Sequence, residues 1–166
     1  MMAVEIERKF LVTGTGWKEG TRGVSYRQGY LNADKERTVR VRIAGEKGFL
    51  TVKGKTEGIS RLEFEYQIPV DDAAQMLDTL CLASIIEKVR YKVPYKGNIW
   101  EIDEFLGANK GLVLAEIELE DENEDFSHPP WLGREVSGDV RFYNSFLSRT
   151  PYSQWPEEEK ITVGKI

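Results

Sequence analysis

An alternation of ionic and apolar side chains with a period of two residues is the feature that most constrains the fold. It recurs in eight segments, which are residues 5–12, 24–32, 37–44, 48–55, 60–70, 85–95, 98–106 and 112–120. A period of two predicts β-strands, and short links rich in Gly, Asn, Asp and Lys between several of them predict antiparallel hairpins. Helical spacing predicts one helix at 71–83 and another at 141–148, with a short one near Trp17.

The ionic side chains of one face often carry the same sign along a strand. Arg40 and Arg42 form one such row, and Glu116, Glu118 and Glu120 form another. Same-face neighbours lie ~7 Å apart, where the repulsion is on the order of 2 kcal/mol per pair at an effective dielectric constant of ~20. A sheet face open to water is the alternative, but such faces are usually mixed polar rather than almost purely ionic. We therefore favour a face that lines a ligand site.

Closing eight antiparallel strands into a barrel would bring all the ionic faces together and leave no open edge. The predicted fold is therefore α+β, an eight-stranded antiparallel closed barrel, or tunnel, with a charged lumen. Its apolar side chains are expected to point outward, beneath a few covering helices. The predicted basic lumen residues are Lys9, Arg40, Arg42, Lys53, Lys55, Arg61, Lys88 and Arg90. The predicted acidic ones are Glu5, Glu7, Glu63, Glu65, Glu101, Asp103, Glu116, Glu118 and Glu120.

The length of the chain limits the number of domains, and its net charge limits the kinds of partner it can bind. The 166 residues predict one domain over residues 1–148 and a tail or extra edge segment at 149–166. A net charge of −5 argues against nucleic-acid binding. No apolar run approaches the ~20 residues of a membrane span, so no membrane partner and a cytoplasmic location are expected. A homodimer is compatible with the sequence, which does not determine the oligomeric state.

Single cysteine and histidine residues exclude other chemistries. Cys81 is the only cysteine, which rules out an intramolecular disulfide. His128 is the only histidine, so these counts argue against a zinc site, a Cys-His pair or a Ser-His-Asp triad unless His128 serves it. Because His128 lies in the loop sequence SHPPW, we expect it to be structurally incidental.

The mixed charges of the lumen indicate the kind of ligand. Arginine and lysine side chains suit a dense polyanion. Clustered carboxylates without histidine or cysteine suit a hard divalent cation, Mg²⁺ or Mn²⁺, which also bridges to phosphate oxygens. A small-molecule linear triphosphate bound with metal fits this set of side chains.

The segment EIERK, residues 5–9, resembles the ExExK signature of the CYTH superfamily, also called triphosphate tunnel metalloenzymes. The resemblance continues in order through YRQGYL, RVRI, LTVKGK, SRLEFEY, EKVRY, WEIDEF, LAEIELE and GREVSGDVRFYNSFLS. A short match is weak by itself, whereas the ordered set is specific. The chain is most similar to the short bacterial members described as adenylate cyclase-like or thiamine triphosphatase-like.

The resemblance implies an eight-stranded tunnel that acts on triphosphates with Mg²⁺ or Mn²⁺. The metal ligands it implies are Glu5, Glu7, Glu116 and Glu118. The candidate substrate-binding residues are Lys9, Arg40, Arg42, Lys53, Lys55, Arg61, Lys88 and Arg90, with Arg134 and Arg141 at one mouth of the tunnel. The candidate catalytic residues are Lys9, Tyr30, Glu63, Glu65 and Asp103. The acids among them would order the lumen, a second metal or the attacking water.

Three functions remain open at this point. The first is a metal-dependent triphosphatase that releases phosphate from inorganic tripolyphosphate or a related organic triphosphate. The second is an adenylate cyclase that converts ATP to cyclic AMP and pyrophosphate. The third is a non-catalytic module that binds polyphosphate or nucleotides. The residues do not choose among tripolyphosphate, thiamine triphosphate and nucleoside triphosphates.

Overall fold

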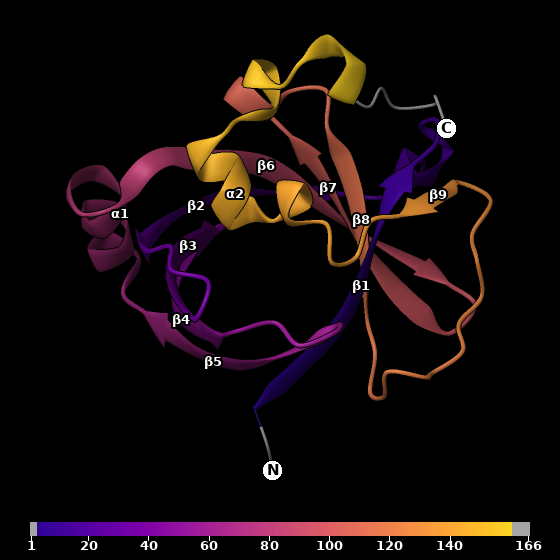
Figure 1. The fold of residues 1–166 in the computed structure, drawn as a ribbon, viewed down its shortest axis with the longest axis horizontal. Coiled ribbons are helices and arrows are strands. Elements are labelled where there is room, and N and C mark those ends of the chain that lie inside the picture. The colour runs from indigo at the N-terminus through magenta and orange to yellow at the C-terminus, as the bar shows by residue number, and fades with distance from the viewer. Residues whose placement is uncertain (1–2, 161–166) are drawn as a thin grey trace.

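Nine strands and two α-helices form within residues 3–160, which are the residues that the computed structural model describes (Figure 1). The strands are β1 (Val4–Val12), β2 (Gly23–Asn32), β3 (Arg37–Ala44), β4 (Lys47–Gly54), β5 (Ser60–Ile68), β6 (Leu82–Tyr95), β7 (Asn98–Phe105), β8 (Val113–Glu118) and β9 (Leu132–Glu135). The α-helices are α1 (Val70–Thr79) and α2 (Asn144–Arg149). Short 3₁₀ helices are η1 (Gly16–Lys18), η2 (Gly107–Asn109), η3 (Val140–Phe142), η4 (Tyr152–Gln154) and η5 (Glu157–Glu159).

Eight of these strands close into an antiparallel barrel, which confirms the predicted fold. Neighbouring strands follow the order β5-β4-β3-β2-β6-β7-β8-β1, and β1 pairs back with β5, where Glu5 lies opposite Arg61. The alternation did not predict β9, which pairs with the other end of β1 and places Glu135 opposite Phe10. Its four residues are too few to display a period of two.

Several predicted boundaries were wrong by a few residues. The strand predicted at 60–70 ends at Ile68 because Pro69, which has no backbone N–H, immediately precedes α1. The helix predicted at 71–83 ends at Thr79 because β6 already begins at Leu82. The helix predicted at 141–148 is divided into η3 and α2, whereas the short helix near Trp17 is confirmed as η1.

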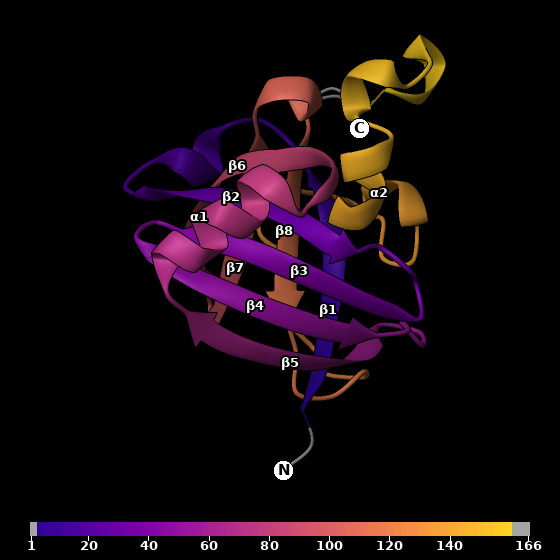
Figure 2. The ribbon, with the colours of Figure 1, turned by 90° about the vertical axis from the view of Figure 1, so that its left-hand side faces the viewer.

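Most outward-facing apolar side chains are covered by segments outside the barrel. Helix α1 crosses the outer face of β3 and β4 (Figure 2), where Ala73 packs against Val41. Gly48 permits this approach, because a Cβ at that position would lie 2.9 Å from the Ala73 Cβ. On β7, Trp100 is fully buried and makes an edge-to-face contact with Trp131 at 5.5 Å between ring centroids. The ionic faces of these strands are thereby left to point inward.

One end of the lumen is filled by hydrophobic side chains. They are Leu11, Ile86, Phe105 and Leu114, each two residues along its strand from an ionic residue, so they share the inner face. They pack with Phe142 and Leu147 from the segment that contains η3 and α2. The prediction that all apolar side chains point outward is therefore wrong at this end. The C-terminal segment closes the barrel where the ionic pattern stops.

Residues beyond α2 continue to pack on this end of the barrel. Tyr152 and Trp155 are buried in the same hydrophobic cluster as Phe142. Part of the predicted tail, residues 161–166, lies outside the described residues. Between residues 3 and 160, no helix has the length and apolar character required to span a membrane. Cys81 is a free thiol.

Candidate active site

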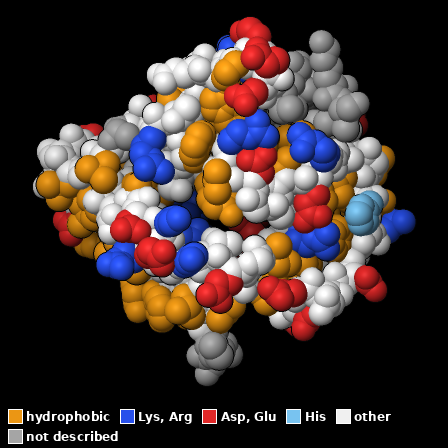
Figure 3. Space-filling model, viewed as in Figure 1, with side chains coloured by type: hydrophobic (Ala, Val, Ile, Leu, Met, Phe, Trp, Pro, Cys, Tyr) orange, Lys and Arg blue, Asp and Glu red, His pale blue; other side chains and the backbone are white. Residues whose placement is uncertain are grey.

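The inner faces of the barrel strands enclose a cavity of about 300 Å³. Figure 3 shows the face on which it opens, where basic and acidic side chains gather around a central hollow. The predicted lumen residues that line it are Glu5, Glu7, Lys9, Tyr30, Arg40, Arg42, Lys53, Arg61, Glu63, Glu65, Lys88, Arg90, Glu101, Glu116 and Glu118. The structure therefore brings together most of the residues that the alternation predicted.

Five predicted side chains do not line the cavity: Asp103, described below, and Lys55, Glu120, Arg134 and Arg141. Lys55 lies one residue beyond the end of β4 and Glu120 lies two residues beyond the end of β8, so the alternation no longer directs them inward, and both are exposed. Arg134 is exposed on β9, which lies outside the closed ring. Arg141 is held by its neighbour Asp139, at 2.7 Å, and is also absent from the cavity lining. The prediction that Lys55 and Glu120 face the lumen is therefore wrong, whereas the place of Arg134 and Arg141 at a mouth of the tunnel stays a prediction.

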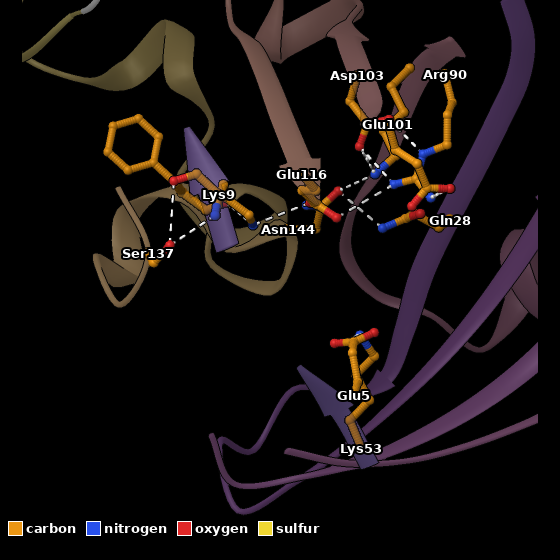
Figure 4. A network of polar contacts seen from close by, with 12 residues as sticks. Glu5, Lys9, Gln28, Lys53, Arg90, Glu101, Asp103, Glu116, Ser137 and Asn144 are labelled. Carbon is orange, nitrogen blue, oxygen red and sulfur yellow. Dashed lines mark hydrogen bonds and ion pairs between the residues drawn. The ribbon is translucent and has the colours of Figure 1, made fainter. Parts of the chain in front are cut away.

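Asp103 lies behind the cavity wall, where it binds two lumen cations. Its carboxylate accepts hydrogen bonds from Arg90 at 2.7 and 2.9 Å and pairs with Lys88 Nζ at 2.7 Å (Figure 4). Burial alone would raise the Asp103 pKa, but Arg90 and Lys88 hold the pKa of this carboxyl well below its usual range. With both oxygens engaged, Asp103 fits the predicted role of ordering the lumen better than that of contacting water or metal.

The basic side of the cavity holds more positive charge than its acidic neighbours neutralise. Burial, followed by the nearby cations Arg40 and Arg90, lowers the Arg42 pKa to about 9. Burial lowers the Lys88 pKa to about 7; Asp103 opposes this shift, while Arg90 and Arg42 add to it. The Arg40 Nε is buried and has no hydrogen-bond partner among the described residues. Unpaired donors and crowded cations are what an anion-binding site presents before its ligand arrives.

Lys9 lies between the acidic residues and the C-terminal segment. Its Nζ donates to the Phe142 carbonyl oxygen at 3.0 Å and approaches Glu116 at 3.6 Å. Burial would lower the Lys9 pKa, but Glu116 and then Glu7 raise it overall, so the amine is charged. Tyr30 lines the same cavity and is among the groups that raise the Lys9 pKa.

On the opposite side, the strand register places carboxylates against carboxylates. Glu7 of β1 lies directly across from Glu118 of β8, and Glu116 lies across from Glu101 of β7. Like charges that face each other across strands destabilise a sheet unless something neutralises them. Burial, with Glu116 and Glu5 adding to it, raises the Glu7 pKa well above its ordinary value. Glu116 differs, because Lys9 and Arg90 outweigh burial and lower its pKa to about 2. The uncompensated negative charge therefore lies at Glu5, Glu7 and Glu118.

Lys53 neutralises only part of this negative charge. Its Nζ lies 3.1 Å from an oxygen of Glu5 and 3.1 Å from an oxygen of Glu63. Figure 4 shows Glu5 and Lys53 apart from the Asp103 network. Burial raises the Glu5 pKa despite the opposing charge of Lys53. Burial would raise the Glu63 pKa, but Glu5 and Lys53 lower it overall.

The acidic side has the donor chemistry of a divalent-cation site. Its donors are carboxylate oxygens, which Mg²⁺ and Mn²⁺ prefer, and the raised pKa values of Glu5, Glu7 and Glu118 all follow from burial among like charges. Among residues 3–160, no three carboxyl, imidazole or thiol groups already converge on one point as a coordination set. The residues therefore fit a metal in chemistry and charge, and binding one requires these side chains to turn toward it.

The raised carboxyl pKa values predict how stability depends on pH without metal. A carboxyl whose folded-state pKa exceeds its unfolded value binds more protons when folded, so stability falls as pH rises above about 4.5 through the raised pKa. We expect the thermal unfolding temperature in chelator to fall across this window and added Mn²⁺ to oppose the fall. Glu7→Gln should flatten the dependence; an unchanged slope in this variant would contradict the assignment.

Two polar residues of the network were missed by the sequence reasoning. Gln28 is fully buried on β2 and accepts a hydrogen bond from Arg42 Nε at 2.8 Å. Asn144, at the start of α2, accepts from Lys88 Nζ at 2.9 Å and from Gln28 Nε2 at 3.1 Å. Gln28 could have been found from its position two residues before Tyr30. Nothing in the local sequence around Asn144 signals that its helix meets the lumen.

Comparison with known proteins agrees with this geometry. The family described as CYTH domain matches residues 3–143. An inorganic triphosphatase of Acetivibrio thermocellus is 55% identical over 94% of this chain and 100% of its own length. An inorganic triphosphatase of Nitrosomonas europaea is 39% identical over 87% of this chain and 96% of its own. A crystal structure of an inorganic triphosphatase superposes with a TM-score of 0.63 and 35% identity, covering 86% of this chain and 96% of that chain.

Proposed function

The chain belongs to the CYTH domain family, and on this premise we propose that it is a metal-dependent triphosphatase acting on inorganic tripolyphosphate or a related organic triphosphate. The observation that carries the proposal is the division of the cavity into two sides. One side crowds Arg40, Arg42 and Lys88, and the other places Glu7 opposite Glu118. A phosphate chain would neutralise the first side, and a divalent cation would neutralise the second. Relatives named inorganic triphosphatase support the same substrate class.

The basic residues bind and orient the substrate in this proposal. Arg40 and Arg42 offer guanidinium donors to phosphoryl oxygens, Arg40 through an Nε that has no partner within the described chain. Lys9 and Lys88 act as point charges at the end of the lumen next to the C-terminal segment. Charge that shifts to the phosphoryl oxygens in the transition state meets donors that are already in place.

Glu5, Glu7, Glu116 and Glu118 would hold the metal, Mg²⁺ or Mn²⁺. A bound ion would supply positive charge to the phosphoryl oxygens and to these carboxylates. Glu63 and Glu65, which also line the cavity on β5, would accept a hydrogen bond from the attacking water. In-line attack by that water forms a new P–O bond, breaks the bridging P–O bond and releases phosphate and the shortened chain.

A phosphate-release screen tests the proposal directly. Purified protein would be incubated with tripolyphosphate, ATP, thiamine triphosphate and pyrophosphate, each with Mg²⁺, Mn²⁺ or chelator. We expect turnover of at least one triphosphate only when metal is present. Analysis of the ATP products separates hydrolysis, which gives ADP and phosphate, from cyclisation, which gives cyclic AMP and pyrophosphate. Absence of turnover across the whole panel would refute the proposal.

Removing a cation from the basic side should weaken substrate binding more than it slows the chemical step. Lys9→Ala and Arg42→Ala each delete a charged donor to phosphate, which is worth about 1.5–3 kcal/mol, so KM should rise about tenfold to hundredfold with a smaller change in kcat. Steady-state kinetics measures both constants. Arg27→Ala is the matched control, because Arg27 pairs with Asp78 at 3.9 Å with its side chain 43% exposed. Unchanged kinetics in both lumen variants would show that these charges do not meet substrate.

A further inference from the structure

The cations of the cavity differ in the groups that hold them. Lys53 lies between two carboxylates, Glu5 and Glu63, and Arg90 is bound by Asp103. These contacts fix the cation and also cancel much of its charge. Arg42, in contrast, is held through its Nε by the neutral side-chain oxygen of Gln28 at 2.8 Å.

Asn144 holds Lys88 through a neutral oxygen in the same way. Its side-chain oxygen accepts from Lys88 Nζ at 2.9 Å and from Gln28 Nε2 at 3.1 Å, so Arg42, Gln28, Asn144 and Lys88 form one hydrogen-bonded chain. Figure 4 shows Gln28 and Asn144 beside the lumen cations. Gln28 and Lys88 are essentially inaccessible to solvent, at 0% and 1% exposed, so the geometry is fixed by packing. The chain connects the barrel wall at β2 and β6 to the start of α2.

The arrangement leaves donors for a ligand. A lysine ammonium has three N–H bonds, and Asp103 and Asn144 engage two of those on Lys88. Arg42 uses Nε for Gln28, and no described residue engages its two terminal nitrogens. Both side chains line the cavity. An amide oxygen thus fixes Arg42 without contributing a negative charge that would compete with phosphate. Lys88 is already paired with Asp103, and Asn144 fixes it further without adding a second negative charge.

We propose that Gln28 and Asn144 are positioning residues whose neutrality keeps the charge of Arg42 and Lys88 available to the triphosphate. The proposal rests on the proposed function for its ligand. It predicts that changing either amide to the acid of the same shape preserves the fold and impairs binding. An added carboxylate would pair with Arg42 or Lys88 and thus compete with the phosphate chain for the same cations, and its negative charge would also repel the phosphate.

The decisive variants are Gln28→Glu and Asn144→Asp. We expect KM for tripolyphosphate to rise about tenfold or more, and kcat to stay within about threefold of the parent value. A tenfold change in binding has the same free energy as a shift of one pKa unit. The unfolding temperature of Asn144→Asp should be kept or raised, because the new carboxylate relieves repulsion among the buried cations. Gln28→Glu has the same gain but also loses the hydrogen bond that Gln28 Nε2 donates to Asn144, so its unfolding temperature should change less. The KM defect of Gln28→Glu should shrink as pH falls, since protonation restores a neutral side chain. Unchanged KM in both variants would overturn the proposal.

Asn109→Asp provides the matched control. Asn109 is also a buried amide, 3% exposed, but its side-chain oxygen accepts from the Tyr152 backbone N–H, and it does not line the cavity. We expect this variant to lower the unfolding temperature and to leave KM unchanged. If Asn144→Asp behaves in the same way, Asn144 has a structural role only and the proposal is wrong.

A ligand-free measurement separates this proposal from the proposed function. Lys88 faces Asp103, Arg90, Arg42 and Glu116, and Asn144→Asp adds one negative charge to that set. The titration midpoint of Lys88, followed by NMR of labelled lysine side chains, should move upward in the variant. If the midpoint shifts but the protein hydrolyses no triphosphate, the positioning role of Asn144 is supported and the proposed triphosphatase activity is wrong. If the midpoint does not shift but the protein is an active triphosphatase, the positioning role is wrong and the proposed function stands.

Discussion

Glu5→Gln is expected to reduce the metal-dependent rate of triphosphate hydrolysis by about two orders of magnitude or more. Glu5 lines the cavity and is among the four carboxylates proposed to hold the metal. A glutamine keeps the shape but loses the negative charge, and a catalytic metal supplies several kcal/mol of transition-state stabilisation. The measurement is kcat at saturating substrate over a series of Mg²⁺ and Mn²⁺ concentrations, so that weakened metal binding and a slower chemical step are distinguished.

Two features of the structure sharpen this test. Glu5 pairs with Lys53 at 3.1 Å, so the substitution also frees that lysine, and the variant can bind substrate as well as the parent while turning it over slowly. Glu87→Gln is the matched control, because Glu87 is exposed on the same barrel but does not line the cavity. A Glu5→Gln enzyme that retains the parental rate and metal dependence would remove Glu5 from the proposed metal site.

The alternation of charge predicted the barrel and most of its lumen because both depend on one local property. Successive side chains of a strand point to opposite faces, so Arg40 and Arg42 must share a face wherever the strand lies. The argument fails where the strand ends, which is why Lys55 and Glu120 do not line the cavity. It also fails where the inner face becomes apolar, as at Leu11.

Contacts between distant segments were beyond the reach of the alternation. Lys9 and Phe142 are separated by 133 positions, and Lys88 and Asn144 by 56. Nothing in either local sequence encodes these pairs, because they depend on how the C-terminal segment packs across the end of the barrel. The place of Asp103 in the lumen was also only partly predictable. Its inward direction follows from the alternation, but its burial behind Arg90 follows only from the assembled barrel.

Asp103→Asn is expected to lower the free energy of unfolding by about 3–5 kcal/mol, the usual loss when one partner of a buried charge pair is removed. Asp103 is 1% exposed and pairs with both Lys88 and Arg90, so the variant leaves two buried cations with much less compensation. Denaturant unfolding at neutral pH measures the loss. Glu104→Gln is the control on the same strand. Glu104 pairs with the partly exposed Lys18, and exposed pairs contribute about 0–1 kcal/mol.

The pH dependence and a double-mutant cycle identify the charge network as the cause. Because the folded-state pKa of Asp103 is depressed, its stabilisation is present above about 3.8 and is lost as pH falls through the folded value. The parent and the Asp103→Asn variant should therefore converge in stability only in strong acid. Combining Asp103→Asn with Lys88→Met should cost less than the sum of the single losses, since residues in one network couple by about 0.5–3 kcal/mol. Strict additivity would mean that Asp103 stabilises the barrel by packing and not through its charge.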